Sequence, residues 1–173
     1  MKIRIATLSL LLLTFAAFAA TPNQNYAGTW VLDLDASKDM PERMREGTRS
    51  WRLDIAQTPE TLTIAIRIER ADDEPFTDTH THRLDGQPST FDATMRTPDG
   101  PVKVPTTTTA KFDANGELDL AISSEMQRGE MMMKRDTKEH LSLSPDGKTL
   151  SVHRLDQTRR GPSEYTMVFK RAA

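Results

Sequence analysis

The stretch His80-Thr81-His82 places two imidazoles two residues apart. In a strand that rises about 3.3 Å per residue, the two rings share one face, and their backbones lie roughly 6.6 Å apart, within reach of one zinc ion. A third ligand would have to come from a neighbouring strand, and Glu139, His140 and His153 are the candidates. We favour the simpler interpretation, an ordinary histidine pair in the interior or on the surface, over a metal site.

Methionines form a second group with possible metal chemistry. Met131-Met132-Met133, with Met126 nearby, offers soft thioether sulfurs of the kind that bind copper(I). Strand alternation would send Met132 to the opposite face from its two neighbours. We therefore favour an apolar strand start, because methionine fills irregular apolar surfaces readily.

Two arginines, Arg135 and Arg154, fall at positions that strand alternation points inward. Buried arginines are rare unless they are paired, and a guanidinium suits a carboxylate or a similar anionic head group. The alternatives are an internal ion pair with Glu139 or Asp78, or outward placement of the arginines after a change of strand register. The pattern leaves these interpretations open.

Catalytic motifs are missing from the sequence. The chain has no cysteine, no Gly-x-Ser-x-Gly elbow and no phosphate-cradling glycine pattern. Asp72-Asp73-Glu74 is typical of a solvated charge run rather than of an acid/base pair. We therefore expect neither an enzyme nor a cofactor.

Alternation of apolar and polar residues dominates the chain and predicts half-buried strands. Turn signals such as Asp85-Gly86 and Asn115-Gly116 separate these segments and favour antiparallel hairpins. One short helix is predicted over Asp39–Gly47, with Met40 and Met44 four residues apart. The fold class is therefore all-β: an up-and-down barrel of about eight to ten strands, with one helix between the first two. A two-sheet sandwich is the alternative. Strands are predicted around Trp30 to Leu34, Trp51 to Ile55, Leu62 to Ile68, Phe76 to Leu84, Thr90 to Arg96, Val102 to Phe112, Leu118 to Met126, Met131 to Leu143, Thr149 to Asp156 and Glu164 to Lys170.

The same alternation assigns side chains to the barrel interior. If Phe76 and Leu84 face inward, then His80 and His82 also do. The argument repeats on later strands and predicts that Thr106, Thr108, Arg135, Thr137, Glu139 and Arg154 face inward. The predicted interior is therefore half polar.

The segment Tyr26-Ala27-Gly28-Thr29-Trp30 resembles the opening of lipocalin-like (calycin) barrels, in which Gly-x-Trp begins the first strand. This resemblance implies that Gly28 and Trp30 are structural, with Trp30 closing the barrel floor. The chain also resembles small exported bacterial lipocalin-like proteins, which share a hairpin like Ser144 to Leu150, and more distantly the fatty-acid-binding branch. That branch grips a carboxylate with Arg-x-Tyr on the last strand, whereas Met167-Val168-Phe169 stands here.

Residues 1–19 are predicted to be a secretory signal peptide, because Lys2 and Arg4 precede an apolar run that ends in Ala17-Phe18-Ala19. The domain would then span residues 20–173, in the periplasm or outside the cell. Without the signal, 21 basic and 25 acidic residues give a formal charge of −4. Mild acidity argues against nucleic acid as a partner. The apolar run is too short for stable membrane insertion.

The predicted function is the binding of a small amphipathic or hydrophobic anion in the barrel interior. The ligand-binding candidates are Arg135, Arg154, His80, His82 and Glu139. Two alternatives remain: a filled barrel that binds an unknown protein partner through its loops, or a zinc or copper protein. Ligand pockets typically enclose about 300 to 1,000 Å³, so the interior volume separates the first two hypotheses.

Overall fold

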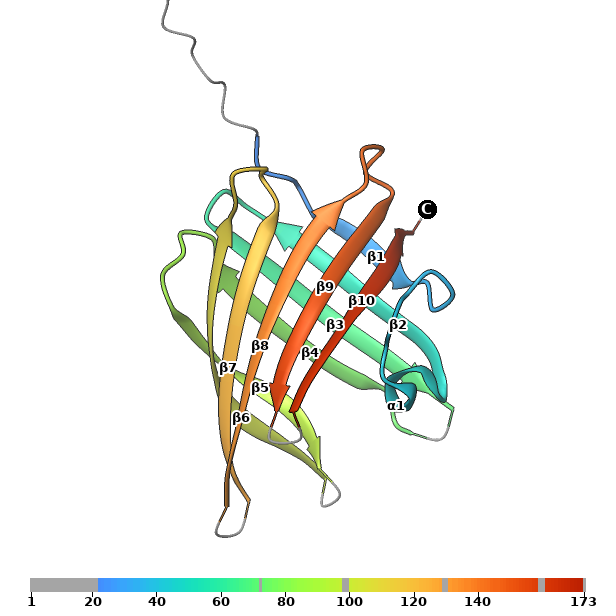
Figure 1. The fold of residues 1–173 in the computed structure, drawn as a ribbon, viewed down its shortest axis with the longest axis vertical. Helices are drawn as coiled ribbons and strands as arrows, with labels where there is room; N and C mark the ends of the chain where they lie inside the picture. The colour runs from blue at the N-terminus through green and yellow to red at the C-terminus, as the bar shows by residue number, and fades with distance from the viewer. Residues whose placement is uncertain (1–21, 72, 98–99, 129–130, 159–160, 173) are drawn as a thin grey trace, which may run out of the picture.

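A computed structural model describes residues 22–71, 73–97, 100–128, 131–158 and 161–172 of the 173-residue chain. The predicted signal peptide therefore lies outside the described residues. In the described part of the chain, no helix has the length and hydropathy needed to cross a membrane. The structure is all-β with one short helix, as predicted (Figure 1). Its elements are β1 (Gly28–Leu32), α1 (Glu42–Arg45), β2 (Thr48–Gln57), β3 (Thr61–Arg70), β4 (Phe76–Arg83), β5 (Ser89–Thr97), β6 (Gly100–Phe112), β7 (Leu118–Arg128), β8 (Met131–Leu143), β9 (Thr149–Thr158) and β10 (Gly161–Arg171).

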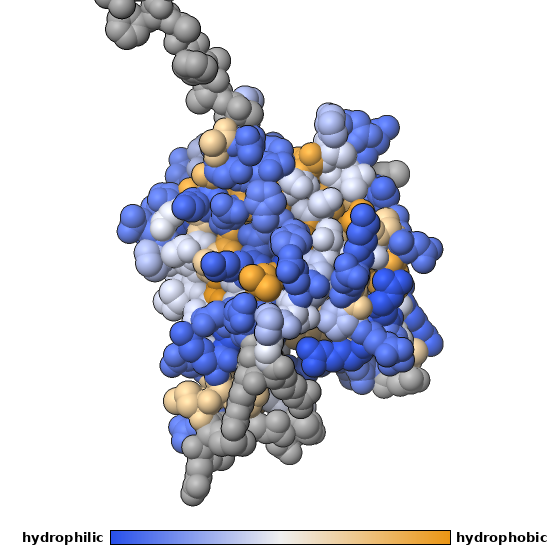
Figure 2. All heavy atoms as spheres, viewed as in Figure 1, coloured by the Kyte–Doolittle hydropathy of each residue, from blue (hydrophilic) through white to orange (hydrophobic). Residues whose placement is uncertain are grey.

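All ten strands belong to one antiparallel sheet with the order β4-β3-β2-β1-β10-β9-β8-β7-β6-β5. Each strand pairs with its neighbour in the sequence except at the β4–β5 step, and β1 pairs with β10, so that the sheet curls into a nearly closed barrel (Figure 1). The prediction of an up-and-down barrel is confirmed, and the two-sheet sandwich is not formed. The face made by β7 to β10 is largely hydrophilic, as expected for the outer side of such a barrel (Figure 2).

The packed core fills the end of the barrel at which the chain enters β1. Tyr26, Trp30, Leu62, Leu118 and Phe169 are fully buried there. The Tyr26 hydroxyl donates to the Leu141 carbonyl at 2.6 Å and accepts the Leu118 N–H at 3.1 Å, which ties the entering chain to β7 and β8. The expected burial of Trp30 at the barrel floor is confirmed.

Helix α1 lies at the opposite end, where β2 begins and β3 ends (Figure 1). It is shorter than predicted, because Pro41 and Glu46 flank it with extended ψ angles of 133° and Gly47 then turns at a φ of 68°. Met40 is buried and Met44 packs against the core, although no residue within α1 is fully buried. A four-residue helix at this position partly covers the barrel mouth.

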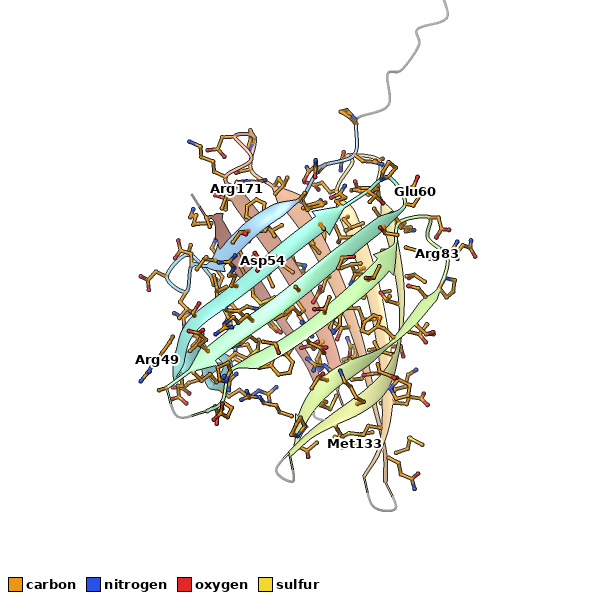
Figure 3. All side chains as sticks on the ribbon, turned by 180° about the vertical axis from the view of Figure 1, so that it is seen from behind. Arg49, Asp54, Glu60, Arg83, Met133 and Arg171 are labelled. Atoms are coloured by element: carbon orange, nitrogen blue, oxygen red, sulfur yellow. The ribbon has the colours of Figure 1, made fainter. Side chains whose placement is uncertain are left out.

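Strands β4 and β5 are the two edges of the sheet, and side chains join them. Asp78 Oδ2 accepts a hydrogen bond from the Thr94 N–H at 2.6 Å and lies 3.0 Å from His80 Nε2. The His80 ring stacks on Phe91 with centroids 4.3 Å apart. These contacts form a side-chain seam, made of Asp78, His80, His82, Phe91 and Thr94, in place of a strand ladder. In Figure 3 the two strands diverge along this seam, with side chains between them.

Candidate ligand-binding site

A cavity of about 540 Å³ lies inside the barrel between the packed floor and α1. Because every second residue of a strand points inward, β2 and β3 give it a continuous apolar wall. The residues of this wall are Trp51, Leu53, Ile55, Ile64, Ile66 and Ile68. The volume falls within the range of about 300 to 1,000 Å³ that is typical of ligand pockets. The interior is therefore not filled by side chains.

The wall across the barrel, formed by β8 and β9, is polar. Arg154 Nη1 lies 2.9 Å from Glu139 Oε1, and Arg154 Nε donates to Asp156 Oδ1 at 3.1 Å. Arg135 Nη2 donates to Asp156 Oδ2 at 2.7 Å, and the Thr137 hydroxyl donates to Asp156 Oδ1 at 2.6 Å. Two guanidinium groups thus face two carboxylates. The internal ion pair between Arg154 and Glu139, one of the interpretations that the sequence left open, is present.

Burial and charge compete at this polar wall. Burial alone would raise the pKa of Asp156, but the Arg154 charge and hydrogen bonds from Thr137 and Arg135 outweigh it and lower the pKa to about 2. Burial would lower the pKa of Arg154, yet the charges of Glu139 and Asp156 raise it above its usual value. Burial raises the pKa of Tyr165 to about 12. At neutral pH the Asp156 carboxylate and the Arg154 guanidinium are therefore charged, whereas the Tyr165 phenol is neutral.

The two histidines line the cavity on the β4 side, at the seam. His82 is only 2% exposed, and its Nδ1 lies 3.3 Å from the Thr108 hydroxyl of β6. Burial, together with the charge of His80, lowers the pKa of His82 to about 4, so that this ring is neutral at physiological pH. Burial would raise the pKa of Asp78, but hydrogen bonds from Thr94 and His80 leave it below its usual value. His80 and His82 therefore act as hydrogen-bonding wall residues.

The candidate third zinc ligands do not gather at this histidine pair. His140 lies 2.9 Å from Asp119 and 3.0 Å from Glu117, and His153 lies 2.9 Å from Glu164. Glu139 faces the cavity but is engaged by Arg154. Within the described ranges, no group of three or more histidine, cysteine or acidic residues has an arrangement that could hold a metal ion.

The methionines of β8 lie away from the cavity. Met132 and Met133 are 62% and 40% exposed, and Met133 lies near the far tip of the β7–β8 hairpin (Figure 3). The side chain of Met131 lies outside the described part of the structure. The described methionines of this strand therefore form neither a lining of the cavity nor a part of the buried core.

Three further arginines line the cavity near its mouth, and the sequence reasoning did not single them out. Arg43 belongs to α1, Arg70 ends β3 and Arg96 lies near the end of β5. Arg96 pairs with Asp73 at 3.1 Å and lies over the Phe76 ring, 5.6 Å from its centroid. Alternation along β3 could have identified Arg70, because it continues the inward series of Ile64, Ile66 and Ile68.

All five predicted ligand-binding residues line the cavity: Arg135, Arg154, His80, His82 and Glu139. Their contact with a ligand stays a prediction. Asp156 was missed as part of the site, although it shares the strand parity of Arg154 and therefore the same signal. With Arg43, Arg70 and Arg96, five arginines line the cavity, against one lining carboxylate among the described residues. The site therefore carries an excess of positive charge.

The nearly closed ten-stranded barrel fits the calycin-like architecture that Gly28 and Trp30 predict. No family model and no curated protein matches the chain. Among solved structures, the chain is similar to a crystal structure of zebrafish ileal bile acid-binding protein complexed with cholic acid. The two share 12% sequence identity, with a TM-score of 0.45, over 85% of this chain and 98% of that one. A likeness this distant assigns no ligand.

Proposed function

We propose that this protein binds a small amphipathic molecule with an anionic head group inside the barrel. The observation that carries the proposal is the cavity of about 540 Å³, which combines an apolar wall with five arginines. Burial of an aliphatic tail against Ile64, Ile66 and Ile68 would stabilise the complex by about 25 cal/mol per Å² of apolar surface removed from water. The excess of guanidinium groups would select an anion over a neutral molecule of the same shape.

Binding without catalysis is part of the proposal. The carboxylates nearest the cavity, Glu139 and Asp156, are held by arginines, and Asp156 has a lowered pKa. A general base needs a pKa near the working pH, so Asp156 is poorly suited to take up a proton. We further propose that the protein acts in the periplasm or outside the cell, because residues 1–19 have the pattern of a signal peptide.

Titration with an anionic fluorescent fatty-acid probe tests the binding. The wild-type protein should bind the probe in the low micromolar range or better, and a non-fluorescent fatty acid should displace it. The methyl ester of the same acid should compete more weakly, because it lacks the charge that the arginines meet.

Two matched substitutions separate the cavity from the outer surface. Ala93→Trp adds a large side chain to the cavity lining and should abolish probe binding. Ala121→Trp places the same side chain on an exposed position of β7 and should leave binding unchanged. Failure of the wild type to bind at high micromolar probe concentration, or equal binding by both variants, would refute the proposal.

A further inference from the structure

The arginines that line the cavity differ in how their charges are balanced. Arg135 and Arg154 face the carboxylates of Asp156 and Glu139, and Arg96 pairs with Asp73. Arg43 and Arg70, by contrast, have no side-chain hydrogen bond or salt bridge with any residue that the structure describes. The uncompensated positive charge of the cavity therefore lies at its mouth, beside α1.

Arg70 also ends an apolar stripe along one strand. Ile64, Ile66, Ile68 and Arg70 alternate along β3 and all four line the cavity. At about 3.3 Å per residue, the stripe from Ile64 to Arg70 is roughly 20 Å long, comparable to an extended long-chain fatty acid. Figure 3 shows β3 running from the end marked by Glu60 to the end marked by Arg49. Ile66 and Ile68 are only partly buried, so their side chains are open to an occupant of the cavity.

We propose that the ligand is a straight-chain amphipathic anion bound with its head group at the mouth, between Arg43 and Arg70, and its tail directed along Ile68, Ile66 and Ile64. This orientation rests on the proposed binding function. Arg135 and Arg154, whose charges are met by Asp156 and Glu139, then form a neutralised side wall rather than the head-group site. Arg43 couples the head group to α1, since it lies on that helix together with Met44.

The orientation can be measured with spin-labelled stearates, because the chain contains two tryptophans. Trp51 lines the cavity and is the strand partner of Ile68, whereas Trp30 is buried in the floor. In a Trp30→Phe variant, the remaining Trp51 should be quenched more strongly by a nitroxide on carbon 5 than by one on carbon 16. The wild-type protein, with both tryptophans, supplies a second measurement if this variant does not fold. Stronger quenching by the carbon 16 nitroxide than by the carbon 5 nitroxide would overturn the orientation while leaving binding intact. No quenching by either stearate would mean that the binding function itself has failed.

Charge removal at the mouth gives an independent test. Arg43→Gln and Arg70→Gln should each weaken stearate binding by roughly threefold to tenfold, and less so in high salt, as expected for partly exposed charge pairs. The affinity for methyl stearate should not change. Arg45→Gln, on the same helix but outside the cavity lining, is the matched control and should leave both affinities unchanged. Full stearate affinity in the Arg43→Gln, Arg70→Gln double variant would overturn the proposed head-group position.

Discussion

The guanidinium of Arg171 lies over the Trp30 ring, 4.2 Å from its centroid, and so joins the last strand to the first. Its Nη1 donates to the Ala27 carbonyl at 2.8 Å and its Nε donates to the Gly147 carbonyl at 2.9 Å. Gly28, at a φ of 140°, leaves room for this arrangement, because a Cβ there would collide with the Arg171 guanidinium. Gly28 and Trp30 of the Gly-x-Trp pattern therefore help to close the barrel by contacting Arg171, which lies near the opposite end of the chain.

Trp30→Ala should lower the free energy of unfolding by about 3 to 5 kcal/mol, the usual cost of deleting a large aromatic side chain from a core. The ring is fully buried, and its Nε1 donates to the Tyr26 carbonyl at 2.9 Å. Denaturant unfolding measures the loss. Val31→Ala is the matched control, since Val31 is the next residue and is 38% exposed, and it should cost less than about 1 kcal/mol. An unchanged unfolding midpoint for Trp30→Ala would contradict the role of Trp30 in the floor.

Asp156→Asn should destabilise the protein by about 3 to 5 kcal/mol, because it removes one partner of a buried ion pair and leaves positive charge uncompensated. The Asp156 side chain is 6% exposed and contacts Arg135, Arg154 and Thr137. The same change should strengthen the binding of an anionic probe in the protein that remains folded. Asp136→Asn, at a half-exposed carboxylate on the outer face that pairs with Lys134, should alter neither property. Equal stability of the two variants would show that the network does not depend on Asp156.

Strand alternation predicted the fold well because the side-chain period of a strand is two and the core lies on one face of the sheet. The same rule placed Arg135 and Arg154 in the cavity. It could also have placed Arg70 in the cavity, because Arg70 has the parity of Ile68. It could likewise have placed Asp156 beside Arg154, because the two residues share the same parity. Neither residue was included in the predicted site, although strand alternation points both of them to the inner face.

Other features depend on tertiary structure and leave no local signal. The seam between β4 and β5 exists because the sheet closes imperfectly, and alternation does not reveal which two strands remain unpaired. The short length of α1 depends on the turn at Gly47 and on the hydrogen bond from the Ala71 N–H to the Gly47 carbonyl. A zinc site at His80 and His82 would need a third ligand from another strand. The sequence alone does not give the strand register that decides whether such a ligand lies close enough.

Amide hydrogen exchange should be faster in α1 than in β3 by several orders of magnitude. A four-residue helix is below the length that is stable alone, and no residue within it is fully buried. A bound amphipathic anion should slow exchange at Arg43 and Met44, because both line the cavity. Exchange in α1 as slow as that of Ile64 in the free protein would instead indicate a fixed plug.

Stability should fall as the pH is lowered from about 6.5 to about 4, and His82 should cause part of the loss. The unfolded ring takes up a proton near pH 6.5, whereas burial lowers the folded pKa to about 4. Above pH 6.5 the His82 ring is neutral in both the folded and the unfolded state, and the stability is fully present. As the pH falls toward 4, the unfolded state binds a proton that the folded state does not bind, so the free energy of unfolding decreases. The expected size is at most roughly 3 kcal/mol. His82→Gln should flatten this part of the stability profile relative to His153→Gln, which removes an exposed imidazole. Parallel profiles for both variants would contradict this assignment.

Asp78 should determine whether the seam stays closed. Its carboxylate accepts the Thr94 N–H and contacts His80, so one side chain replaces the ladder that β4 and β5 lack. Asp78→Ala leaves the Thr94 N–H without its acceptor and should cost about 1 to 3 kcal/mol, the penalty of an unsatisfied partly buried donor. Asp78→Ala should speed amide hydrogen exchange in β4 and β5 while leaving β2 and β9 protected. Because the variant opens the seam, a fatty-acid probe should also associate and dissociate faster than in the wild type. Asp92→Ala, at an exposed position of β5, is the control and should change none of these rates. If exchange rose uniformly across the barrel, Asp78 would stabilise the fold as a whole rather than the seam in particular.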